Sequence, residues 1–187
     1  TDMMGPLGSG YALLWNNTKK ELSAIDFNGV APLATDPQLF DIEKKRRGIL
    51  AATVPGALKG WHEIHKKCGT KPWAELWQDA IQYALGRPLD EESAFHIRRH
   101  VQELGIYESW AKEFLGPDNR PLPAGTIHKR PTVAQTYRAF AARGADALYK
   151  GEVGDKLVAF IKKEKGLITK DDLARYSVKW LTPLKTT

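Results

Sequence analysis

Two short strands near the start of the chain constrain its fold more than any other feature. An apolar run at 11–15 leads into the tight-turn sequence Asn16-Asn17, and a second strand is predicted at about 21–27. Together these residues predict a β-hairpin over 10–27. Because an isolated two-stranded hairpin is at best marginally stable in water, this hairpin must join a larger sheet.

After the hairpin the pattern becomes helical. Within 153–161 the apolar residues recur at i, i+4, i+7 and i+8, which places them on one face of a helix. Thr169, followed by Asp171 and Asp172, is typical of the start of another short helix, since a hydroxyl can cap free backbone amides and negative charge suits that end. Further helices are predicted at 55–67, 73–85, 91–104, 107–115 and 131–143.

A hairpin followed by helices over 55–176 indicates an α+β fold that is mostly helical in this stretch. A chain of 187 residues, 42% of them hydrophobic, can bury one sizeable core, so a single domain over 1–187 is predicted. No apolar run approaches the roughly 20 residues of a membrane span, and no membrane partner is expected. The single cysteine, Cys68, excludes a disulfide within the chain and leaves the cellular compartment open.

The positive charge of the chain raises the question of an anionic partner. The net charge is +6, and its densest run is Lys-Lys-Arg-Arg at 44–47. A run of this kind is more often a solvated loop than a nucleic-acid patch, so no nucleic-acid partner is predicted. The same run supports one alternative for the whole chain, a non-catalytic helical interaction module that binds an anionic partner through 44–47.

The histidines do not form a convincing metal site. His96 and His100 lie four residues apart, as in a zinc protease helix, but isoleucine replaces the glutamate that such a helix needs after its first histidine. His62, His65 and Cys68 are spaced by three, and on a helix the first and last diverge by about 240°. They cannot converge on one ion, and no metal is predicted.

The glycines at 5, 8 and 10 superficially resemble a dinucleotide-binding loop. Such a loop follows a strand and opens a helix. Here no strand comes before the glycines within the chain, and a strand follows them. The order is wrong for a phosphate-binding turn, so no organic cofactor is predicted.

Four segments carry a resemblance to a known family. They are VPGALKGW at 54–61, PWAELWQDAIQYA at 72–84, the stretch from RPLPAG to LYKGEV at 120–153, and GLITKDDLARY at 166–176. In this order and spacing they resemble the large-subunit region of the γ-glutamyltranspeptidase family, over nearly the whole chain. The family belongs to the N-terminal nucleophile hydrolases. The resemblance therefore implies part of an αββα sandwich, with the hairpin in the central sheets and the helices covering them.

The resemblance also implies an activity, which is transfer or hydrolysis of γ-glutamyl or related acyl groups held in amides. In the family, autocatalytic cleavage makes a threonine the first residue of the small subunit, where its own α-amino group can take the hydroxyl proton. No such nucleophile is assigned here, because Thr186-Thr187 follow a segment that lies well upstream of the cleavage point in the family. The chain is thus predicted to be a large-subunit fragment, inactive by itself, whose partner is the small subunit of the same precursor.

One position stands out as a substrate-binding candidate. In γ-glutamyl-specific members the hairpin leads into Asp-Gly-Arg-Glu-Thr-Ala-Pro, whose arginine grips the α-carboxylate of the substrate. The matching stretch here is DFNGVAP at 26–32, which puts Asn28 in the place of that arginine. The neutral amide of asparagine cannot replace the charged, planar guanidinium of arginine, so the acylase-like branch of the family is favoured. The alternative is that another basic residue, outside this fragment or from a neighbouring loop, supplies the charge.

Overall fold

The structure, a computed structural model, describes residues 5–38 and 47–184. Its internal contacts divide the chain into two compact units. One unit runs up to Leu76 and resumes at Ala139, and the other consists of Trp77–Arg138. We call them the sheet unit and the insert unit and describe each by itself. The single domain expected from the sequence stays a prediction.

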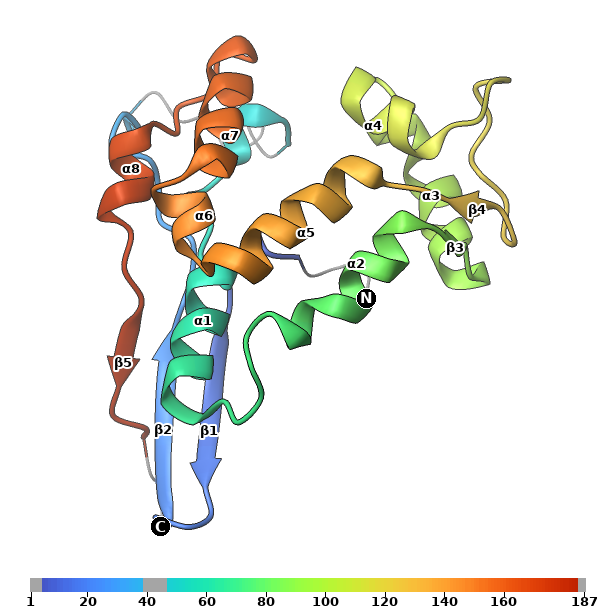
Figure 1. Ribbon diagram of the computed structural model, residues 1–187. Coiled ribbons are helices and arrows are strands. Elements are labelled where there is room, and N and C mark those ends of the chain that lie inside the picture. Colours follow the sequence, from blue (N-terminus) through green and yellow to red (C-terminus); the bar gives the residue numbers. More distant parts are fainter. Residues whose placement is uncertain (1–4, 39–46, 185–187) are drawn as a thin grey trace. The chain divides into compact units, whose positions relative to one another are not determined.

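A three-stranded antiparallel sheet organises the sheet unit (Figure 1). Strands β1 (Tyr11–Asn16) and β2 (Glu21–Asp26) pair so that Tyr11 faces Asp26 and Asn16 faces Glu21, which confirms the predicted hairpin. A short strand that the sequence analysis missed, β5 (Lys179–Leu181), pairs with the other side of β2. The central strand β2 therefore has a partner on each side.

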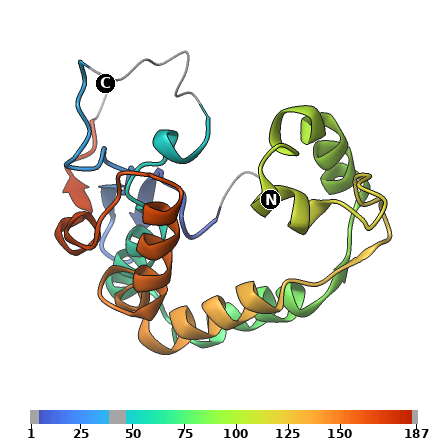
Figure 2. The same cartoon turned by 90° about the horizontal axis from the view of Figure 1, so that it is seen from above.

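Helix α1 (Ala57–Cys68) covers one face of this sheet. Ile25, Phe27 and Ala57 are buried together, and partly buried side chains pack against them: Ala12, Leu14, Trp61, Ile64 and Val178. Gly60 permits the close approach, since a Cβ there would lie 2.2 Å from the ring of Phe27. Seen from above in Figure 2, α1 (teal) lies against the hairpin strands (blue). The core of the sheet unit thus forms between helix and hairpin.

The other face of β1 carries exposed apolar side chains. Tyr11, Leu13 and Trp15 are 66%, 71% and 58% exposed. They alternate along the strand with Ala12 and Leu14, which pack toward α1, as the two-residue period of a strand requires. Strand β1 therefore has apolar residues on both faces, a pattern typical of a sheet that is covered on both sides.

Short helices complete the sheet unit: α6 (Asp146–Tyr149), α7 (Glu152–Lys163) and α8 (Lys170–Arg175), together with the 3-10 helix η1 (Ile49–Ala51). The predicted apolar face at 153–161 holds only in part, because Ile161 is buried whereas Phe160 is 44% exposed. The predicted start of α8 is confirmed. Thr169 accepts a hydrogen bond from the amide of Asp172, and the carboxylate of Asp172 accepts one from the amide of Thr169.

The insert unit is built from helices and one very short β-ladder. Its elements are α2 (Gln78–Leu85), β3 (Arg87–Pro88), α3 (Glu91–Leu104), α4 (Glu108–Phe114), β4 (Ile127–His128) and the first part of α5 (Pro131–Arg143). Asp90 caps α3, and hydrogen bonds from Ser93 lower the pKa of this carboxyl to about 2. The rings of Trp77 and Tyr137 contact each other in a tilted arrangement, with centroids 5.4 Å apart. This ring contact connects the two ends of the unit.

The helical predictions are confirmed with one notable difference. The helix expected at 73–85 is interrupted, because a 3-10 turn, η2 (Glu75–Trp77), comes before α2. The described residues mix helices and short strands, as an α+β fold requires, and the complete αββα sandwich stays a prediction. Within 5–38 and 47–184, no helix combines the length and the apolar character needed to cross a membrane.

Candidate functional site

Asn28 lies directly after β2, on a loop that we call the Asn28 loop (residues 26–35). Its side chain is exposed, and its amide Nδ2 donates a hydrogen bond to the hydroxyl of Tyr11. Its backbone N–H donates to Asp26 Oδ1 at 2.8 Å, and its carbonyl accepts from the Tyr176 hydroxyl at 2.9 Å. The backbone is therefore held from the protein side, while the neutral amide faces outward.

The floor beneath the Asn28 loop is closely packed. The backbone amide of Val54 donates to the carbonyl of Val30 at 2.9 Å. The rings of Tyr149 and Tyr176 stack with centroids 5.6 Å apart, and the hydroxyl of Tyr149 donates to the carbonyl of Pro55 at 2.8 Å. Burial raises the pKa of Tyr176 to about 12, so its hydroxyl stays a neutral donor near pH 7. The floor is a rigid aromatic platform.

Lys59 supports the same platform from α1. Its Nζ donates to the backbone carbonyl of Tyr176 at 3.0 Å and lies 4.7 Å from the ring centroid of Tyr149. Burial lowers the pKa of Lys59 below its ordinary value. The sequence does not point to Lys59, since a single lysine within a helix carries no signal of its tertiary contacts.

Helix α8 contacts the far end of the Asn28 loop through a buried carboxylate. Asp172 is only 5% exposed. Its Oδ1 accepts from the backbone N–H of Leu33 at 2.7 Å, and its Oδ2 accepts from the N–H and hydroxyl of Thr169 at 2.7 and 2.6 Å. Burial acts to raise the pKa of this carboxyl, but the hydrogen bonds from Thr169 and Leu33 outweigh it, and the pKa is lowered.

The glycine-punctuated loop before β1 has a structural role. The carbonyl of Gly8 accepts from the amides of Gly56 and Ala57 at 2.9 and 2.8 Å, and the carbonyl of Pro6 accepts from the amide of Leu58 at 3.1 Å. These donors are the amides at the start of α1, which have no partner within the helix itself. The loop therefore caps α1 with its own carbonyls. Because these carbonyls occupy the free amides of α1, the loop is not arranged to bind a phosphate.

Comparison with known proteins identifies the family. The sequence model described as Gamma-glutamyltranspeptidase matches residues 1–187. The chain belongs to the γ-glutamyltranspeptidase family. A glutathione hydrolase proenzyme of Pseudomonas aeruginosa is 32% identical over 185 residues, which cover 95% of this chain and 32% of that protein. Glutathione hydrolase 3 of Arabidopsis thaliana is 29% identical, over 95% of this chain and 28% of that protein.

Solved structures of γ-glutamyltranspeptidases and of an acylase share the fold. The Helicobacter pylori γ-glutamyltranspeptidase superposes with a TM-score of 0.91 at 30% identity, over 98% of this chain and 54% of that one. A cephalosporin acylase from Bacillus halodurans superposes with a TM-score of 0.86 at 27% identity, over 98% and 36%. This γ-glutamyltranspeptidase-family chain spans about a third of the length of the curated relatives it matches.

The other residues considered in the sequence take structural roles in the γ-glutamyltranspeptidase-family chain. His62 and His65 both contact the ring of Trp73, at centroid distances of 4.8 and 5.2 Å. His96 and His100 stack at 6.3 Å. In the part of the chain that the structure describes, no three His, Cys, Asp or Glu side chains are grouped to hold a metal ion. Lys44 to Arg46 and Thr186-Thr187 lie outside the described residues.

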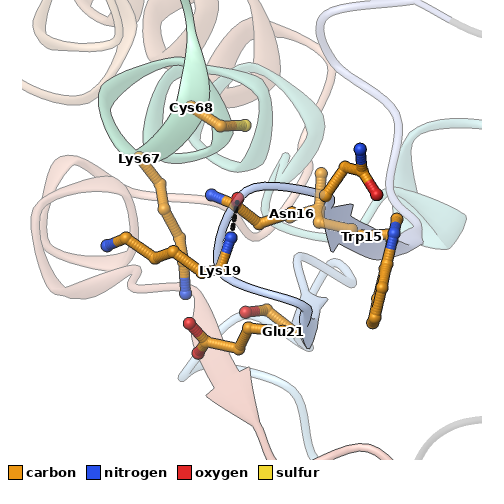
Figure 3. Close-up of a pocket in the computed structure, with 9 residues that line it drawn as sticks. Trp15, Asn16, Lys19, Glu21, Lys67 and Cys68 are labelled. Carbon is orange, nitrogen blue, oxygen red and sulfur yellow. Dashed lines mark hydrogen bonds between the residues drawn. The ribbon is translucent and has the colours of Figure 1, made fainter.

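A hollow of about 290 Å³ lies at the turn end of the hairpin, opposite to the Asn28 loop (Figure 3). The hairpin contributes Lys19 and Glu21, and α1 contributes Lys67 and Cys68. The Nζ of Lys67 lies 4.2 Å from the ring centroid of Trp180. Charges of both signs line this hollow, and one of its two lysines, Lys67, contacts an aromatic ring. The Asn28 loop is the stronger candidate site in this γ-glutamyltranspeptidase-family chain.

The buried carboxylate of α8 predicts a specific acid sensitivity. Because the pKa of Asp172 is lowered by folding, its stabilising effect is complete above the ordinary carboxyl pKa of about 4 and is lost as the pH falls through the lowered value. The Asp172→Asn variant is expected to unfold at a lower temperature than the unmodified protein at pH 7, with a smaller difference at pH 3. Thermal unfolding of the complete enzyme between pH 3 and pH 7 measures this difference in unfolding temperature.

The control for this prediction is Asp171→Asn, an exposed neighbour on the same helical turn that pairs with Arg175. Its unfolding temperature should differ little from that of the unmodified protein at either pH, since exposed ion pairs contribute about 0–1 kcal/mol. An Asp172→Asn deficit that is as large at pH 3 as at pH 7 would contradict the role given to the carboxylate.

Proposed function

We propose that this chain is the large-subunit part of an acyltransferase or hydrolase that cleaves γ-glutamyl or related acyl amides. The nucleophile is the threonine at the start of a small subunit, outside these 187 residues, and the Asn28 loop binds the acyl group. The observation that carries the proposal is the position of Asn28 in this chain, which belongs to the γ-glutamyltranspeptidase family. Asn28 is an exposed amide donor on a fixed backbone at the end of β2, and the family motif described above would place an arginine there in γ-glutamyl-specific members.

The acylase-like branch fits this position better than a strictly γ-glutamyl-specific enzyme. A γ-glutamyl group carries an α-carboxylate, and a guanidinium can bind a carboxylate through two charge-assisted hydrogen bonds. The amide of Asn28 offers only neutral donors, and its Nδ2 already donates to Tyr11. A glutaryl group or another acyl group without the α-carboxylate requires no such partner, and we infer that groups of this class are the preferred substrates.

The small subunit is the proposed partner of the exposed face of β1. Tyr11, Leu13 and Trp15 form an apolar row that is more than half exposed. Covering such a row is favourable by roughly 25 cal/mol for each Å² of apolar surface removed from water. A second sheet from the small subunit would cover it and complete the αββα sandwich. The proenzyme names of relatives such as the Pseudomonas aeruginosa protein support processing of this kind.

Activity measurements on separated parts test the proposal. A polypeptide of residues 1–187 is expected to hydrolyse neither γ-glutamyl nor glutaryl anilide, because its nucleophile is missing. The complete processed enzyme should hydrolyse at least one of them, and alanine in place of the small subunit's first threonine should abolish that activity. Turnover by purified 1–187, free of any other subunit, would overturn the assignment of the nucleophile.

A further inference from the structure

Helix α8 and the residue that follows it contact the Asn28 loop at two separate points. Asp172, in the first turn, accepts from the backbone N–H of Leu33 at 2.7 Å. Tyr176, just after the last turn, donates its hydroxyl to the backbone carbonyl of Asn28 at 2.9 Å. We propose that Asp172 and Tyr176 are positioning residues that hold the Asn28 loop in its acyl-binding conformation. This inference rests on the function proposed for the loop.

The first of these two contacts is rigid because hydrogen bonds from outside the loop already fix the carboxylate of Asp172. Three hydrogen bonds converge on Asp172, two from Thr169 and one from Leu33. The bond from the Thr169 amide belongs to the capping box of α8, and both Thr169 bonds lie within the start of the helix, so they do not depend on the loop. The side chain is nearly excluded from water, and a hydrogen bond to a buried charge is stronger than one between neutral groups.

The second contact is rigid because the tyrosine cannot swing away. The ring of Tyr176 stacks on Tyr149 with an angle of 12° between the planes, and Lys59 donates to its backbone carbonyl. Gly56 lies under its hydroxyl, where a Cβ would come within 2.3 Å of that oxygen. The ring and the backbone of Tyr176 are thus both held, and its hydroxyl has little room to move away from the carbonyl of Asn28.

Both contacts act on the backbone of the loop and involve none of its side chains. A third backbone tie, from the amide of Val54 to the carbonyl of Val30, lies between them in the sequence. Asn28, Val30 and Leu33 are all exposed. A loop fixed in this way presents a preformed surface, and substrate binding need not order it. Loss of a tie should therefore weaken binding of the ground state and of the transition state alike, which raises KM and leaves kcat unchanged.

Leu33→Pro tests the Asp172 contact without altering Asp172. Proline has no N–H to donate. The amide of Thr35 donates to the carbonyl of Pro32, so residue 33 is the second residue of a turn, a position that favours proline. Leu33→Ala is the matched control, because it removes the same exposed side chain and keeps the N–H. In the complete enzyme we expect Leu33→Pro to raise KM by about tenfold relative to Leu33→Ala, with kcat within about twofold.

Amide hydrogen exchange reads the same contact without any substrate. Leu33 and Thr169 donate to different oxygens of Asp172, and asparagine keeps an acceptor oxygen at only one of the two positions. Exchange in the 27–36 peptide should therefore be at least about tenfold faster in Asp172→Asn than in Asp171→Asn. Tyr176→Phe, which keeps the stacked ring and loses only the hydroxyl, should also raise KM and leave kcat unchanged.

The two measurements separate the possible failures. Equal KM values for Leu33→Pro and Leu33→Ala, or a fall in kcat alone, would overturn the positioning role even in an active enzyme. Equal exchange rates in Asp172→Asn and Asp171→Asn would overturn the physical tie itself. If exchange accelerates as expected but the unmodified enzyme hydrolyses neither anilide, the tie is supported, and it is the proposed function that fails.

Discussion

Asn28→Arg in the complete processed enzyme is expected to increase the preference for γ-glutamyl over glutaryl anilide by a factor of tens to thousands. The two substrates differ by the α-amino and α-carboxylate groups, so a guanidinium at this position gains a carboxylate partner only in the first. Loss of one member of a desolvated charge pair typically costs about 2–5 kcal/mol, and about 1.4 kcal/mol corresponds to one decade. Restoring the pair should recover a comparable amount.

The structure favours this substitution because Asn28 is exposed and its backbone is held independently of its side chain. The Asn28 carbonyl accepts from Tyr176 and the N–H donates to Asp26, and neither bond depends on the amide. Among the described residues, the side-chain bond that would be lost goes to Tyr11, which is itself 66% exposed. A longer side chain can therefore extend outward without disturbing the loop.

Two variants, one neutral and one positively charged, serve as controls for this experiment. Asn28→Gln lengthens the side chain without charge and should leave the ratio of the two kcat/KM values nearly unchanged. Asn28→Lys adds a point charge without the planar fork, and its effect should be smaller than that of arginine. A shift of the same size in Asn28→Gln, or no shift in Asn28→Arg, would show that this position does not contact the α-carboxylate.

Gly56→Ala is expected to destabilise the sheet unit strongly. A Cβ on Gly56 would lie 2.0 Å from the backbone carbonyl oxygen of Phe27 and 2.3 Å from the hydroxyl of Tyr176. The first neighbour is the backbone of Phe27, directly after β2, which exchanges two hydrogen bonds with Gly10 and cannot move by itself. Overpacking in a core costs about 1–3 kcal/mol and sometimes more, and we expect at least about 3 kcal/mol here.

Gly5→Ala is the matched control, since a Cβ at Gly5 has no neighbour within 4 Å. Denaturant unfolding of the complete enzyme, followed by the fluorescence of its tryptophans, measures the free energy of unfolding for both variants. A Gly56→Ala protein as stable as Gly5→Ala would mean that α1 does not approach the end of the hairpin as closely as described.

Local patterns were sufficient to predict much of this fold. The hairpin and the start of α8 are determined by neighbours in sequence, through strand alternation and a capping box. Strand β5 was missed because it is three residues long and wholly exposed, and only its pairing with β2 makes it a strand. The break before α2 was missed as well. Trp73 donates its Nε1–H to the carbonyl of Phe140 at 2.7 Å, a tertiary bond that no local pattern indicates.

The candidate site shows the same contrast between features that local sequence predicts and features that depend on tertiary contacts. Asn28 could be found because a short motif places it. The contacts of Asp172 and Tyr176 with the loop connect residues 139 and 148 positions apart. Asp172 was correctly predicted to lie at the start of a helix, and this role alone was a sufficient reason for a carboxylate at its position. Nothing in the local sequence indicated that its second oxygen would accept from the backbone of a distant loop.

The most direct test of the central claim is the ratio of kcat/KM on γ-glutamyl and glutaryl anilides for the complete processed enzyme with Asn28 unaltered. If the exposed amide of Asn28 occupies the acyl-binding position without a charged partner for the α-carboxylate, the glutaryl compound should be hydrolysed as well as the γ-glutamyl compound, or better. A strong preference for the γ-glutamyl compound, left unchanged by Asn28→Arg, would contradict that claim.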